Sequence, residues 1–250
     1  MSILTESEIK NRIKNKELKP FDEFKVKKGV IITPLAISFL KENKIKLKYV
    51  DDEKCIDKEN EDINVSRYKY ITEYGGFLDK KPEYMTQLYK NKLVFKDNKL
   101  IKLRGKLDSL QSEILKAQIY ADKMKLDKLV KDLQEILDFV RNILKCEIID
   151  EAIEEFNLLN MNETELRDIS HHPKKYFGID HLFTIDYKLG EVVVILNSLR
   201  SLVRETELVA YSAFKNEEGK VVREDIIKAL NRLSSLMYIM IFKYLKGNYD

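Results

Sequence analysis

The chain has 250 residues, 44% of them hydrophobic, and its 45 Lys and Arg against 42 Asp and Glu give a formal net charge of +3. This near balance argues against nucleic acid as the main partner, because binding to a phosphate backbone requires a clear excess of positive charge. No apolar run is long enough to span a bilayer, no signal peptide is recognisable, and the two Cys fit neither a disulfide framework nor a metal spacing, so we expect a cytoplasmic protein without a membrane partner.

The first part of the chain is predicted to form a small α/β unit. Thr5-x2-Glu8 is typical of a capping box at a helix start, and Thr33-Pro34 places a proline at the first position of a second helix. Apolar runs at residues 29–32 and 45–50 flank that second helix and predict short strands. Together these patterns indicate a strand-helix-strand unit over roughly residues 20–50.

A mainly α region is predicted to follow an acidic linker. Asp51–Asp62 is almost devoid of apolar residues, which is typical of a solvated linker. We therefore expect two parts: residues 1–66 as the small unit and its linker, and residues 67–250 as a helical bundle. Tyr68–Pro82 is interpreted as an irregular connector. Only 8 Gly and 4 Pro in the whole chain agree with a helix-dominated fold.

A basic run precedes the first long helical pattern. It consists of Lys96, Lys99, Lys102, Arg104 and Lys106. One interpretation is a solvated basic edge. The other is binding of an anion such as a triphosphate, because backbone donors and the helix dipole at a helix N-terminus favour negative charge. The sequence contains no P-loop motif, so any such site differs from that of the P-loop proteins.

Further helices and a connector follow along the chain. Leu126–Ile149 has the apolar repeat of a strongly amphipathic helix and is interpreted as scaffold. Asn162, with Glu165 in the capping-box position, predicts a short helix that ends before Pro173. The segment Ser170–Gly190 holds all three histidines, for which capping or hydrogen bonding is favoured over a shared metal ion.

Two polar stripes interrupt the apolar helical patterns near the C-terminus. Arg200, Arg204 and Glu207 stand at i, i+4 and i+7, which places them on one helix face. The last helix repeats this spacing with Asn231, Ser234 and Tyr238. Charged stripes are often solvent-facing, but the Asn lies among many apolar neighbours, where an unmatched polar group is costly. The stripes therefore indicate a bound ligand or a neighbouring subunit.

These same residues carry a resemblance to a known family. Arg-x3-Arg-x2-Glu, at positions 200–207, is followed after a loop by Asn-Arg-Leu-Ser at positions 231–234. This pattern resembles the C-terminal signature of the ATP:corrinoid adenosyltransferases of the propanediol-utilization type, and the surrounding residues are similar to their ethanolamine-utilization branch. The resemblance implies an up-and-down bundle of about five helices, assembled as a trimer with active sites between subunits. It also implies transfer of the 5′-deoxyadenosyl group of ATP to cob(I)alamin, with release of triphosphate.

The resemblance implies a role for each candidate site residue. Arg204, Arg200 and Asp108 are the expected catalytic residues, with Asp108 pairing with Arg200 across a subunit interface. Arg204, Glu207 and Asn231 are expected to bind ATP, and Glu207 also to orient Arg204 or to hold Mg through water. The family's phosphate-binding loop is absent, and Lys96 and Arg104 are interpreted as its replacement. Phe183, and less strongly Tyr176, are expected to contact the lower face of cobalamin.

The resemblance also bears on cofactors and partners. The Cys and His cluster that binds metal in many ethanolamine-type enzymes is missing from Tyr68–Pro82, so we expect no protein metal cluster and Mg only as the companion of ATP. A corrinoid reductase and an adenosylcobalamin-dependent enzyme are expected partners, in the cytoplasm or at a bacterial microcompartment. The alternatives are a non-catalytic corrinoid carrier of the same pathway and a purely structural bundle.

Overall fold

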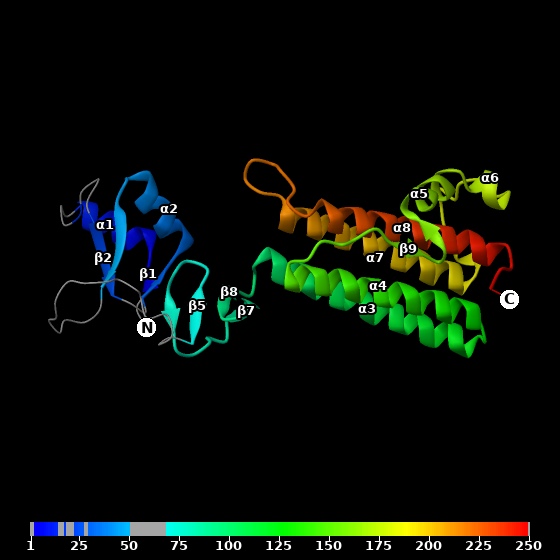
Figure 1. The fold of residues 1–250 in the computed structure, drawn as a ribbon, viewed down its shortest axis with the longest axis horizontal. Helices are drawn as coiled ribbons and strands as arrows, with labels where there is room; N and C mark the ends of the chain where they lie inside the picture. Colours follow the sequence, from blue (N-terminus) through cyan, green and yellow to red (C-terminus); the bar gives the residue numbers. More distant parts are fainter. Residues whose placement is uncertain (1–2, 15–17, 19–22, 28–29, 51–68, 250) are drawn as a thin grey trace. The chain divides into compact units, whose positions relative to one another are not determined.

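The computed structural model describes most of the chain, namely residues 3–14, 18, 23–27, 30–50 and 69–249 (Figure 1). It divides the chain into two compact units, residues 1–96 and 97–250. The predicted acidic linker and Cys55 lie outside the described residues. The boundary predicted after residue 66 differs from the division between residues 96 and 97, because a small sheet that follows the linker belongs to the first unit.

The first unit begins with two helices and two parallel strand pairs. The elements are β1 (Ile3–Leu4), α1 (Glu6–Lys14), β2 (Glu23–Lys27), β3 (Ile31–Ile32), α2 (Pro34–Glu42) and β4 (Lys46–Val50). β1 pairs with β3, and β2 pairs with β4. The Thr5 backbone N–H donates to the Glu8 carboxylate at 2.8 Å, and the Thr33 side chain caps α2. Both predicted helix starts and the strand-helix-strand unit β3-α2-β4 are therefore confirmed.

A four-stranded sheet begins in the segment that the sequence suggested was an irregular connector and continues beyond it. Its strands are β5 (Tyr70–Thr72), β6 (Phe77–Leu78), β7 (Met85–Tyr89) and β8 (Lys92–Phe95), in the order β6-β5-β8-β7. β5 and β8 are parallel, and the other neighbours are antiparallel. Within Tyr68–Pro82 the structure has the two strands β5 and β6, which were not predicted because strands of two or three residues are too short to give a clear alternation of apolar and polar residues.

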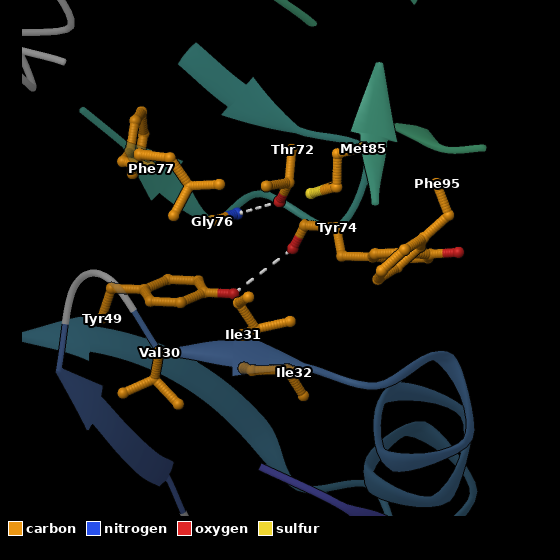
Figure 2. A pocket seen from close by; sticks show the side chains of 11 residues that line it. Val30, Ile31, Ile32, Tyr49, Thr72, Tyr74, Gly76, Phe77, Met85 and Phe95 are labelled. Atoms are coloured by element: carbon orange, nitrogen blue, oxygen red, sulfur yellow. Dashed lines mark hydrogen bonds between the residues drawn. The ribbon is translucent and has the colours of Figure 1, made fainter. Parts of the chain in front are cut away.

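An apolar crevice lies within the first unit, where the side chains of Val30, Tyr49, Tyr74 and Phe95 gather (Figure 2). The Tyr49 hydroxyl donates to the backbone carbonyl of Tyr74 at 3.4 Å, and the Tyr74 and Phe95 rings lie 6.3 Å apart. The space inside is about 10 Å³, which is room for about one water molecule. The crevice is therefore a place where apolar side chains pack together, and it is too small for a nucleotide or a corrinoid.

The second unit is a helical bundle (Figure 1). Among residues 97–249 its long helices are α3 (Lys99–Lys123), α4 (Asp127–Ile149), α7 (Glu191–Phe214) and α8 (Glu224–Leu245). Between α4 and α7 lie the strands β9 (Asn157–Leu158) and β10 (Met161–Asn162), the helices α5 (Glu163–His171) and α6 (Pro173–Phe177), and a 3-10 turn (Tyr187–Leu189). The predicted mainly α fold and its helical bundle are confirmed, as is the capping box of Asn162 and Glu165 on α5.

The connection between α4 and α7 sets the directions of the helices. Helices α3 and α7 are antiparallel, because Tyr120 near the end of α3 contacts Glu191 at the start of α7. Lys106 near the start of α3 likewise contacts Glu205 in the second half of α7. α3 and α8 therefore run one way and α4 and α7 the other, with residues 150–190 returning along the bundle (Figure 1). This refines the expected up-and-down order, since the long connector allows α4 and α7 to be parallel.

The bundle core is apolar, and α8 lies at its centre. Leu236–Phe242 is buried throughout, and α8 contacts α7, α5, α4 and α6. This stretch of α8 is therefore internal to the bundle. Among the described residues, no helix has the length and apolarity needed to cross a membrane.

Candidate functional site

A pocket of about 430 Å³ lies in the second unit, where the end of α5, the connector that follows α6, and helices α7 and α8 meet. Six residues singled out from the sequence line it together: Phe183, Arg200, Arg204, Asn231, Ser234 and Tyr238. The serines of α8 that follow the asparagine, Ser234 and Ser235, add polar groups to the same wall. The pocket thus combines cationic, hydrogen-bonding and aromatic groups.

The two arginines make the pocket cationic. They lie one helical turn apart on α7, and the guanidinium of Arg200 stands 4.6 Å from the centre of the Tyr238 ring. Burial lowers the pKa of Arg200, the neighbouring charge of Arg204 lowers it further, and Tyr238 opposes both effects. Arginine nonetheless stays protonated in proteins. Among the described ion pairs none joins either arginine to a carboxylate, so this part of the pocket favours an anion.

Asn231 is held by the acid of the α7 stripe. Its side-chain N–H donates to Oε1 of Glu207 at 3.1 Å, so the two polar stripes meet between α7 and α8. Glu207 is half-buried and does not line the pocket. The structure thus gives Glu207 a contact with Asn231, and its predicted action on Arg204 or on Mg stays a prediction.

The family resemblance implies that the pocket binds ATP. On that basis we expect Asn231→Ala to lower kcat/KM for ATP, with an increase of about 1–3 kcal/mol in the activation free energy, because a hydrogen-bonding group at the pocket wall is removed. The fold should persist, since Asn231 is only half-buried. Steady-state kinetics with varied ATP, together with a thermal unfolding curve, measures both effects. Wild-type kinetics in a folded variant would remove Asn231 from the site.

The two predicted corrinoid residues lie in different surroundings. Phe183 is 93% exposed and lines the pocket, so its ring is available for contact with a ligand. The Tyr176 hydroxyl on α6 donates to Asp168, and hydrogen bonds from Tyr176 and Lys175 lower the pKa of that carboxyl group. Tyr176 is not among the lining residues. A role for Phe183 is supported by its position, and a role for Tyr176 stays a prediction.

Three other predicted residues lie outside the lining of the pocket. Arg104 donates from Nε to the Glu147 carboxylate of α4 at 2.6 Å, and a second nitrogen donates to the other oxygen at 3.1 Å. Asp108 is exposed on α3, and the described ion pairs within one chain do not join it to Arg200. Lys96 is exposed at the end of the first unit. Their assigned roles stay predictions.

Sequence reasoning missed the contribution of His171 and His181 to the pocket wall. Tyr238 was visible in the polar stripe of the last helix, but its partners come from segments far away in the sequence. The described residues contain no group of three or more His, Cys, Asp or Glu suited to a metal ion, and Cys146 is a free, buried thiol. The ring of His181 contacts the Tyr238 hydroxyl and the backbone carbonyl of His171.

A helical bundle with a pocket lined by two arginines defines a class of protein suited to binding an anion. Residues 77–244 match the family model described as cobalamin adenosyltransferase, and the chain belongs to that family of transferases. It is 36% identical over 165 residues to the corrinoid adenosyltransferase EutT of Salmonella typhimurium, a match covering 64% of this chain and 58% of that relative. It is 28% identical over 224 residues to EutT of Escherichia coli K12, covering 84% and 80%.

Proposed function

We propose that this protein transfers the 5′-deoxyadenosyl group of ATP to cob(I)alamin in ethanolamine utilization, forming adenosylcobalamin and releasing triphosphate. The observation that carries the proposal is the pocket itself. Two arginines without a described carboxylate partner share it with an almost fully exposed phenylalanine, so it offers one region for a polyanion and one for a large apolar face. The similarity to corrinoid adenosyltransferases supports the choice of substrates.

The reaction requires the protein to align the two substrates and to stabilise the negative charge on the leaving group. The cobalt atom of the substrate attacks C5′ of the ribose, the C5′–O bond breaks, and its electron pair leaves on triphosphate. Negative charge therefore grows on the leaving group, and Arg204, together with the Mg that accompanies ATP, stabilises it more strongly in the transition state than in the bound ATP. This accounts for a site without a protein nucleophile, since the substrate supplies the attacking atom.

Phe183 provides the corrinoid side of this proposal. Placed under the ring, its apolar side chain excludes water and base from the lower face of cobalt. Removal of the lower ligand makes the Co(II) form easier to reduce to the attacking Co(I) form. A corrinoid reductase and an adenosylcobalamin-dependent enzyme are the partners that this chemistry requires on either side of the reaction.

We propose that the protein needs no resident metal ion of the Cys and His kind, because Tyr68–Pro82 contains neither residue. We therefore expect activity to need only Mg supplied with ATP. Treatment with a chelator selective for zinc and iron should leave kcat unchanged in the presence of Mg. Loss of activity that added zinc or ferrous iron restored would contradict this expectation.

We also propose a trimer in which Asp108 pairs with Arg200 of a neighbouring subunit. Asp108 is exposed on α3, and no ion pair of the described chain occupies Arg200, so both are accessible to a partner. Asp108→Ala and Arg200→Ala should each reduce activity or assembly, and the double variant should lose less than the sum of the two. Kinetics measures activity and light scattering measures assembly. Strictly additive losses would refute the proposed pairing of Asp108 with Arg200.

The function is tested by mixing the protein with MgATP and chemically reduced cobalamin and following the optical spectrum. We expect the spectrum of adenosylcobalamin to appear together with an equal amount of triphosphate. Cobalamin binding without turnover would instead identify a carrier, and neither binding nor turnover would leave only a structural bundle.

A further inference from the structure

One hydroxyl group of the bundle contacts the connector next to Phe183. Residues 178–186 form no helix or strand, and Ile179, Leu182 and Ile185 pack against the bundle core. The backbone N–H of Leu182 donates to the Tyr238 hydroxyl oxygen at 3.0 Å, and Nδ1 of His181 lies 3.3 Å from the same oxygen. The hydroxyl therefore contacts the two residues immediately before Phe183.

The contacts of His181 define the direction of each hydrogen bond. Its Nε2 lies 3.1 Å from the backbone carbonyl of His171, which only accepts, so Nε2 carries a proton and donates. In the neutral ring Nδ1 then accepts, and the Tyr238 O–H donates to it. One chain of bonds thus runs from the Leu182 amide through Tyr238 and His181 to His171, with every group satisfied. It ties the connector to both α8 and α5.

The ring of Tyr238 is itself fixed. Only 8% of the residue is exposed, and the ring meets Phe242 edge to face at a centroid distance of 4.8 Å. The guanidinium of Arg200 stands over this ring at 4.6 Å. A rigid aromatic ring therefore supports an arginine of the anion region and, through its hydroxyl, the segment that bears the exposed phenylalanine.

We propose that Tyr238 is a positioning residue that sets the corrinoid side of the pocket: its hydroxyl holds His181 and Leu182 so that Phe183 meets the lower face of the corrinoid, while its ring seats Arg200. This rests on the proposed function. The hydroxyl and the ring serve different substrates, so removing the hydroxyl alone separates their effects.

Tyr238→Phe removes the hydroxyl and keeps the ring, the Arg200 contact and the Phe242 contact. The Leu182 N–H then loses its partner. We expect KM for cobalamin to rise about tenfold, as for loss of a buried hydrogen bond, and KM for ATP to change less than about twofold. The spectrum of bound cob(II)alamin should lose the features that report a missing lower ligand. The amide hydrogen of Leu182 should exchange faster with solvent.

Tyr249→Phe is the matched control. Tyr249 is also buried, and its hydroxyl donates to Asp132 at 2.7 Å, but it does not line the pocket. It should lower stability as Tyr238→Phe does and leave KM for cobalamin and the cob(II)alamin spectrum unchanged. Equal effects of the two variants on cobalamin, or an unchanged cobalamin KM and spectrum in Tyr238→Phe, would overturn the proposal. A wild-type protein that binds cobalamin without transfer would instead refute the proposed function, and the binding and exchange measurements would still decide the role of Tyr238.

Discussion

Arg204→Ala is expected to lower kcat/KM for adenosyl transfer by about 10²–10³-fold, the effect typical of removing one group that stabilises charge in a transition state. Arg204 is exposed in the pocket wall and pairs with no carboxylate among the described residues, so its charge is available to the leaving triphosphate. For the same reason its removal should leave the free energy of unfolding close to that of the wild type. Steady-state kinetics and a denaturant titration measure the two quantities.

Two further variants make the result specific. Arg204→Lys keeps the charge and loses the planar fork of donors, so part of the activity should return. Arg141→Ala removes an exposed arginine of α4 that pairs with Asp138 at the surface, and its activity should remain that of the wild type. If Arg204→Ala were as active as Arg141→Ala, the anion would bind elsewhere and the assignment of the pocket would fail.

The helices could be predicted because their signals are local. The apolar repeat of α4 and the capping pairs at α1 and α5 need only residues within one or two turns of each other. The sheet of β5–β8 could not, because its strands are short and its central pair, β5 and β8, joins segments separated by both of the other strands. Its register is set by pairing partners, which a single segment of sequence does not reveal.

The site was only partly predictable for a related reason. Arg200, Arg204 and Asn231 were found because helical spacing places them on defined faces. Tyr238 acquires its role from His171, His181 and Leu182, which a long connector brings to α8. A sequence also gives the position of a basic residue without its partner. The basic run suggested an anion site at Arg104, whereas most of the run lies within α3 and the fold brings a buried glutamate to Arg104.

That glutamate leads to the largest expected effect on stability. The Glu147 side chain is 1% exposed, and Arg104 binds both of its oxygens from α3. Arg104→Ala would leave a buried carboxylate without its cation, so we expect the free energy of unfolding to fall by about 3–5 kcal/mol. Chemical denaturation at neutral pH measures the loss.

The double variant Arg104→Met with Glu147→Leu separates this structural role from the predicted binding of triphosphate. Replacing both members of a buried ion pair with apolar residues of similar size is often neutral or stabilising, so the double variant should recover most of the stability that Arg104→Ala loses. If Arg104 serves only to join α3 to α4, the folded double variant will keep the wild-type KM for ATP. If Arg104 also binds the triphosphate, the double variant will be stable and will have a raised KM for ATP, and the basic run at the start of α3 will belong to the nucleotide site.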